Sequence, residues 1–144
     1  MPSNRASPLQ AEFLQLAPAQ VQALSDELAQ GLLQPQPSIA PKFLYDALGS
    51  KLFETITDLD EYYPPRTEAA IFERHRDELA QACGGGHTLV DLGAGNCAKA
   101  ASLFDALRPS RYVAVDISVD FLRRALHELQ SRHPQLPMLG LGTD

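Results

Sequence analysis

Leu89-Val-Asp-Leu-Gly-Ala-Gly-Asn-Cys97 is the stretch that decides the fold class of this 144-residue chain. An apolar run leads into a turn with two glycines, Gly93 and Gly95, which lack a Cβ and let backbone amides approach a ligand closely. A helix starting directly after the turn would point its N-terminus at the same place. The next apolar run, residues 112–116, ends at Asp116, whose carboxylate can accept hydrogen bonds from two ribose hydroxyls. The pattern predicts a cradle for a nucleoside cofactor.

Two classes of cofactor use such a cradle. Gly93, Gly95 and Ala98 satisfy the glycine pattern of dinucleotide-binding folds, with an acid about 20 residues further on, so NAD is one candidate. Asp91, two residues before the first glycine, favours the other class. It stands where class I S-adenosylmethionine (SAM) methyltransferases carry the acid of their glycine motif, and a carboxylate attracts a sulfonium and an ammonium but not a pyrophosphate. We therefore interpret the turn as a SAM site, with dinucleotide binding and a ligand-free glycine turn as the alternatives.

Composition restricts the other function classes. Hydrophobic residues make up 44% of the chain and charged residues 21%, which are ordinary values for one globular domain. The net charge of -6, with no visible basic patch, argues against nucleic acid as a partner. No apolar run approaches the length of a membrane span and the N-terminus lacks a signal-peptide core, so a cytoplasmic chain is expected. The 2 cysteines and 4 histidines follow no metal or redox spacing, and no metal is expected.

The chain divides into three predicted parts. Residues 1–17 are polar and interrupted by proline, and they predict a loose arm. Residues 18–84 predict a helical region on the substrate side, with helices at about 18–31, 42–57 and 67–83 and an interruption of the second at Gly49-Ser50. Residues 85–144 alternate as strand 88–92, helix 97–107, strand 112–116, helix 118–132 and strand 137–141. The predicted fold class is α/β: a partial Rossmann-like sheet of three parallel strands with helices, preceded by a helical N-terminal region.

From Pro41 onward the sequence resembles a known family. Three blocks carry the likeness: Tyr45-Asp-Ala-Leu-Gly-Ser50, Glu61-Tyr-Tyr-Pro-Pro-Arg-Thr-Glu68 and Asp91-Leu-Gly-Ala-Gly-Asn-Cys-Ala-Lys99. Over about residues 38–144 they are similar to the N-terminal half of the histidine Nα-methyltransferases of ergothioneine biosynthesis. The resemblance implies a SAM-dependent enzyme that trimethylates the α-amino group of histidine to give hercynine.

The resemblance also implies roles for individual residues. Tyr45 and Tyr62 match tyrosines of the amino-acid pocket, although their periodicity alone would make them core or loop anchors. No catalytic base is expected, because methyl transfer from a sulfonium to a neutral amine depends on placement and on exclusion of water. The family usually has Glu at the position of Asp91 and a hydroxyl residue at that of Ala100. These two departures affect the fine positioning at the cofactor site and not the class of cofactor. The predicted cofactor-binding residues are Asp91, Gly93, Gly95, Lys99, Asp116 and Asp144.

Three readable strands are fewer than the seven of a class I methyltransferase sheet. The sequence is therefore interpreted as an N-terminal fragment or truncated relative of the enzyme. Two alternatives stay open: a methyltransferase of the same branch acting on another amino acid or an indole-derived amine, and a non-catalytic remnant that binds SAM or a partner. Because the strand at 88–92 would lie in the middle of a complete sheet, an unpaired edge and self-association of this chain are expected.

Overall fold

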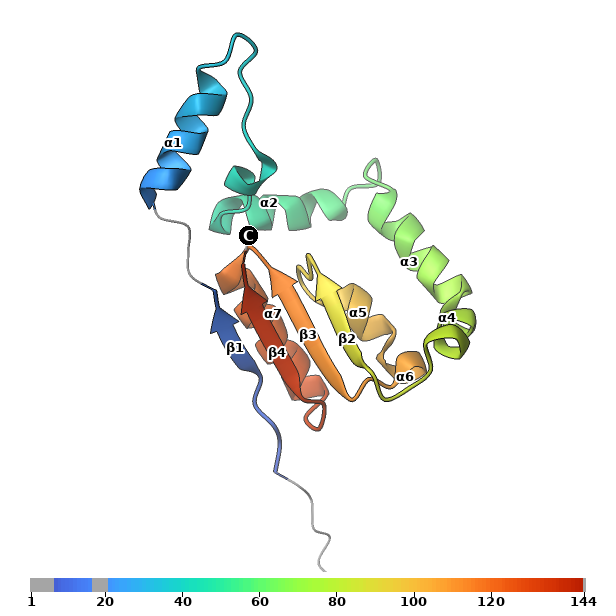
Figure 1. The fold of residues 1–144 in the computed structure, drawn as a ribbon. Coiled ribbons are helices and arrows are strands. Elements are labelled where there is room, and N and C mark those ends of the chain that lie inside the picture. The colour runs from blue at the N-terminus through green and yellow to red at the C-terminus, as the bar shows by residue number, and fades with distance from the viewer. Residues whose placement is uncertain (1–6, 17–20, 144) are drawn as a thin grey trace, which may run out of the picture.

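Four parallel strands form one sheet in the order β1-β4-β3-β2, in a computed structural model that describes residues 7–16 and 21–143 (Figure 1). The strands are β1 (Glu12–Gln15), β2 (Thr88–Leu92), β3 (Arg111–Asp116) and β4 (Met138–Gly142). The three strands after residue 85 lie where their apolar runs predicted them. The partial Rossmann-like α/β fold is confirmed, and the N-terminal segment adds a fourth strand.

Three helices lie on one face of this sheet, behind it in Figure 1. They are α5 (Ala98–Ser102), α6 (Phe104–Leu107) and α7 (Val119–Arg132). The core between helices and sheet is built around Tyr112 of β3, against which Leu122, Leu126 and Leu129 of α7 and Phe104 of α6 gather. Leu122, Leu126 and Leu129 recur at the spacing of one helix face, so the sequence period alone predicts which side of α7 is buried.

The predicted loose arm of residues 1–17 is wrong at residues 12–15, which pair in parallel with β4. Phe13 stands opposite Gly140 in the register. A Cβ at Gly140 would come within 2.5 Å of the Phe13 ring, so the absence of a side chain on β4 makes room for that ring. The guanidinium of Arg123 also lies over the Phe13 ring, 4.2 Å from its centroid. The strand therefore depends on partners more than a hundred residues away, which a local pattern does not reveal.

The helical region begins beyond the carboxyl ends of the strands and then descends beside β2 (Figure 1). It comprises α1 (Val21–Leu32), a 3-10 turn (Pro41–Leu44), α2 (Ala47–Thr57), α3 (Pro64–Arg74) and α4 (Arg76–Cys83). Figure 1 shows α2 crossing above the ends of β2 and β3, with α3 and α4 descending beside β2. This arrangement covers the edge of the sheet at which the glycine turn lies.

Two boundaries in this region differ from the prediction. The break in the second helix falls at Tyr45 and Asp46, because the Asp46 side chain accepts a hydrogen bond from the Gly49 amide and starts α2 there. The third helix begins at Pro64 instead of Thr67, because two successive prolines occupy a first turn whose amides need no partner within the helix. His75 then separates α3 from α4.

The other face of the sheet carries no helix among the described residues (Figure 1). Side chains on that face are apolar and exposed: Val90 is 53% accessible, Leu92 75% and Leu14 55%. Within the described part of the chain, β2 also has a strand on one side only. A parallel sheet is ordinarily covered on both faces, so among the described residues this surface lacks a covering layer, and β1 and β2 are the two open edges of the sheet. No described helix is both long enough and apolar enough to cross a bilayer.

Candidate functional site

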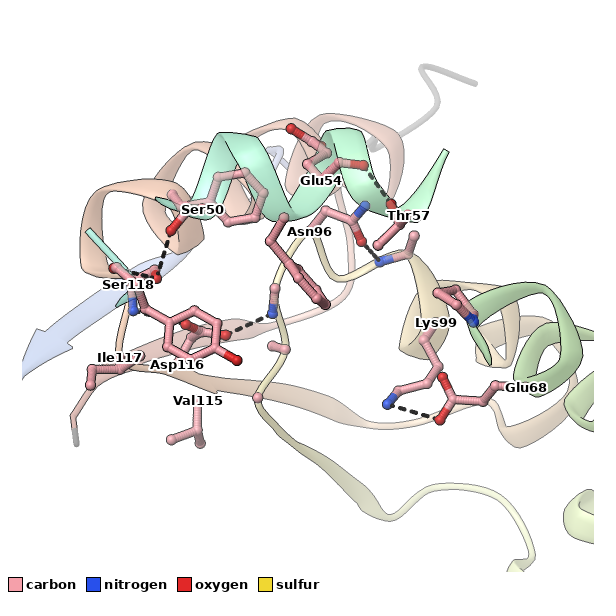
Figure 2. Close-up of a pocket in the computed structure, with 18 of the residues that line it drawn as sticks. Ser50, Glu54, Thr57, Glu68, Asn96, Lys99, Val115, Asp116, Ile117 and Ser118 are labelled. Atoms are coloured by element: carbon pink, nitrogen blue, oxygen red, sulfur yellow. Dashed lines mark hydrogen bonds and ion pairs between the residues drawn. The ribbon is translucent and has the colours of Figure 1, made fainter. Parts of the chain in front are cut away.

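A cavity of about 960 Å³ opens where β2 and β3 end and where α2 and α3 face them (Figure 2). Its walls come from the glycine turn, the first turn of α5, the end of β3 and the inner faces of α2 and α3. Cavities of this size hold a nucleoside cofactor and leave room for a small substrate. Parallel α/β sheets bind ligands at the carboxyl ends of their strands, and this cavity lies at that edge.

The glycine turn is built for close approach of a ligand. Gly93 and Gly95 have φ angles of 69° and 53°, values that favour glycine. The amides of Gly93 and Ala94 both donate to the Val115 carbonyl, at 2.9 and 3.0 Å, and so attach the turn to β3. A Cβ built at either glycine would meet nothing within 4 Å. The space beside the turn is therefore free for a cofactor, and both predicted glycines line it.

Asp116 lies at the end of β3 and faces the same turn. One carboxylate oxygen, Oδ2, accepts from the Gly95 amide at 2.8 Å, and the other, Oδ1, accepts from the Ser118 amide at 2.8 Å. Two backbone donors thus fix the orientation of the carboxylate. Each oxygen keeps a further lone pair, so the group can still accept hydrogen bonds from ribose hydroxyls. This geometry fits the role that the sequence predicted for Asp116.

Asp91 occupies a different place from the other predicted cofactor residues. It is 8% exposed and points to the helix side of the sheet, where its Oδ2 accepts from the Tyr112 hydroxyl at 3.0 Å. Burial, above all, raises the pKa of Tyr112 far above its ordinary value, so the phenol stays a donor. Asp91 is not among the described residues that line the cavity. The structure gives it a supporting position beneath the turn, and direct contact with a cofactor stays a prediction.

Lys99 projects from the first turn of α5 into the cavity wall. Its Nζ lies 3.6 Å from Oε1 of Glu68, which comes from α3 (Figure 2). Both residues line the cavity, and their side chains are 42% and 52% exposed. The sequence pointed to Lys99 but not to Glu68, because the contact joins two elements that are 31 positions apart. Asp144, the last predicted cofactor residue, lies outside the described residues.

The two predicted substrate tyrosines are separated by one aromatic ring. Tyr45 lines the cavity together with Phe53. The Phe53 ring packs edge-on against Tyr45, at 6.5 Å between centroids, and also against Tyr62, at 6.2 Å. Among the described residues that line the cavity, Tyr62 is absent. The structure thus brings Tyr45 to the cavity, whereas Tyr62 contacts the cavity residue Phe53 and its role in substrate binding stays a prediction.

The Tyr45 to Ser50 block attaches the helical region to the cofactor side of the cavity. Gly49 allows the start of α2 to pass the preceding turn, because a Cβ there would lie 1.8 Å from the Leu44 carbonyl oxygen. The Ser118 hydroxyl donates to the Tyr45 carbonyl at 3.1 Å and contacts the Ser50 hydroxyl at 3.0 Å. Ser118 follows Asp116 by two positions. Sequence reasoning missed Ser50 and Ser118, whose contact spans 68 residues.

The parallel sheet, the glycine turn and the fixed carboxylate define a Rossmann-like domain, the class of domain in which nucleoside cofactors bind at this edge of the sheet. Comparison with known proteins then identifies the family. The family model described as "Histidine-specific methyltransferase, SAM-dependent" matches residues 24–144. The chain belongs to this family of SAM-dependent methyltransferases, as the resemblance of its sequence blocks predicted.

Individual relatives agree with the family assignment. The chain is 38% identical over 122 residues to the histidine N-alpha-methyltransferase of Mycolicibacterium smegmatis, covering 82% of this chain and 38% of that protein. It is 33% identical over 115 residues to the N-methyltransferase imqF of Aspergillus flavus, covering 77% and 31%. It is 37% identical over 92 residues to ergothioneine biosynthesis protein 1 of Neurospora crassa, covering 61% and 10%. The chain thus spans well under half the length of these relatives.

Proposed function

We propose that this chain is the cofactor-binding part of an enzyme that transfers methyl groups from SAM to the α-amino group of histidine, giving hercynine. The observation that carries the proposal is the Asp116 carboxylate, oriented by two backbone amides at the mouth of a glycine turn that leaves open space. Asp116 would hold the ribose, the turn would lie against the cofactor, and Lys99 would attract its carboxylate. The cofactor supplies a methyl group activated on a sulfonium.

The remaining walls of the cavity suit the substrate side of this reaction. Tyr45 and Phe53 offer aromatic surface with one hydroxyl, which can exclude water and still bind an amine or an imidazole. The hydrogen bonds of Ser118 to Tyr45 and Ser50 hold this wall at a set position relative to Asp116. Placement of a neutral amine in line with the methyl group is the main requirement of the reaction, and a rigid wall serves it.

A second candidate is methylation of another amine. The similarity to imqF, which is named an N-methyltransferase without reference to histidine, supports it. Both candidates share the cofactor side of the cavity and differ only in the substrate. A non-catalytic SAM-binding role is the third possibility that the experiment must separate.

The test combines binding and turnover. We expect calorimetry with this chain to show binding of S-adenosylhomocysteine, the product form of the cofactor, and none of NAD. Methyl-labelled SAM should label histidine, with hercynine detected by mass spectrometry, when the longest natural form containing this chain is used. Labelling of another amine and not histidine would support the second candidate, and binding without any transfer would support the third. Binding of NAD in place of S-adenosylhomocysteine would contradict the cofactor assignment itself.

We also propose that the 144-residue chain self-associates through the uncovered sheet face and the β2 edge. Val90 and Leu92 expose apolar surface beside unpaired strand backbone, a combination that promotes pairing with a second chain. Light scattering should show a dimer or larger species that dissociates on dilution. Leu92→Lys should increase the monomer fraction, whereas Leu33→Lys, at an 84% exposed position in the helical region, should not. A wild-type chain that stays monomeric at every concentration would contradict the proposal.

A further inference from the structure

Lys99 and Glu68 form an ion pair in the wall of the cavity. The separation of 3.6 Å between Nζ and Oε1 exceeds an ordinary hydrogen bond, so each head group can take another partner. An ion pair between half-exposed side chains adds little stability. The two groups come from separate elements, α5 and α3, and both face the cavity. This arrangement suits recognition better than support of the fold.

The chemistry of the pair matches one class of ligand. An α-amino acid carries a carboxylate and an ammonium on the same carbon, so its receptor needs a cation and an anion a few ångströms apart. The Lys99 ammonium offers three donors to a carboxylate, and the Glu68 carboxylate accepts from an ammonium. An amino-acid end inserted between them would exchange one loose ion pair for two charge-assisted contacts.

The position of the ion pair in the cavity indicates whether it binds the amino-acid end of the cofactor or that of the substrate. Figure 2 shows Asp116 and the pair at separate ends of the group of lining residues. SAM carries its ribose and its methionyl group on opposite sides of the sulfonium. With the ribose at Asp116 and the cofactor following the glycine turn into α5, the methionyl end reaches Lys99, which stands in the first turn of that helix.

We infer that Glu68 binds the methionyl ammonium of the cofactor, while Lys99 binds its carboxylate. Glu68 is then a specificity residue that distinguishes SAM from nucleosides without an amino-acid end. The inference rests on the proposed function, because it names a contact of the same cofactor. It also gives α3, a helix of the substrate-side region, a direct part in cofactor binding.

The experiment compares two ligands that differ only at this end. S-adenosylhomocysteine has the amino-acid end, and 5′-methylthioadenosine lacks it. Calorimetry should show that Glu68→Gln binds S-adenosylhomocysteine about tenfold more weakly than wild type, because one half-exposed contact to a charged group is lost. The variant should bind methylthioadenosine with the affinity of wild type. Glu128→Gln is the matched control, because Glu128 is an exposed acid of α7 that is not among the residues lining the cavity, and it should leave both affinities unchanged. Glu68→Asp, which keeps the charge, should give an intermediate loss.

Each other outcome has a defined meaning. If Glu68→Gln changes both ligands by the same factor, or neither, the assignment to the methionyl end is overturned. If the variant weakens binding of free histidine and not of S-adenosylhomocysteine, the pair receives the substrate and the assignment is likewise overturned. If wild-type chain binds methylthioadenosine and S-adenosylhomocysteine equally, the pair has no role in recognition, although the nucleoside site stands. Failure of wild type to bind either ligand overturns the proposed function instead.

Discussion

Asp116→Ala is expected to weaken binding of S-adenosylhomocysteine by about 1.5 to 3 kcal/mol, the range for hydrogen bonds to a charged group. The carboxylate is the acceptor for the ribose in the proposed site. It also accepts from the Gly95 amide at 2.8 Å, so its removal takes away one of the bonds that shape the turn. Asp116→Asn should lose less affinity, because an amide oxygen can still accept from Gly95.

Calorimetric titration of the three proteins checks this expectation. Asp105→Ala serves as the control, because Asp105 is an exposed acid in the first turn of α6. It should leave affinity unchanged while altering the net charge by the same amount. If wild type and Asp116→Ala bind S-adenosylhomocysteine with equal affinity, this carboxylate does not bind the ribose.

Gly49→Ala is expected to lower the free energy of unfolding by about 3 kcal/mol, at the upper end of the usual cost of overpacking. The added Cβ would lie 1.8 Å from the Leu44 carbonyl oxygen and 2.9 Å from its carbon. These are backbone atoms, so either the 3-10 turn or the start of α2 must move. That movement would also displace Ser50 from Ser118, so histidine-dependent turnover should fall more than affinity for the cofactor.

Urea unfolding followed by circular dichroism measures the loss, and Gly85→Ala is the matched control. A Cβ at Gly85 would lie 3.6 Å from its nearest neighbour, the Leu107 carbonyl oxygen, which is ordinary contact. The control should unfold like wild type or be slightly more stable, since alanine restricts the unfolded chain. If Gly49→Ala unfolds like the control, then α2 does not approach the preceding turn as closely as the structure shows.

Some residues that line the cavity belong to local sequence motifs, and others reach it only through contacts between distant elements. Gly93, Gly95, Lys99 and Asp116 all line the cavity, and each belongs to a short motif that directs it there. Tyr62 packs against Phe53 and is not among the described residues that line the cavity, so its part in substrate binding stays a prediction. Glu68 lines the cavity and belongs to one of the three sequence blocks, but sequence reasoning assigned it no role, since its partner comes from another helix.

The sequence by itself determined the features that rest on neighbours along the chain. The three strands after residue 85, the helix after Asp116 and the glycine turn follow from residue spacing and from backbone conformations open to glycine. The tertiary structure alone decided the pairing of β1 with β4, the support of Asp91 by Tyr112 and the attachment of Ser50 to Ser118. The reason is physical: a local pattern reports which side of an element is apolar, whereas these contacts form only after long loops close and bring particular surfaces together.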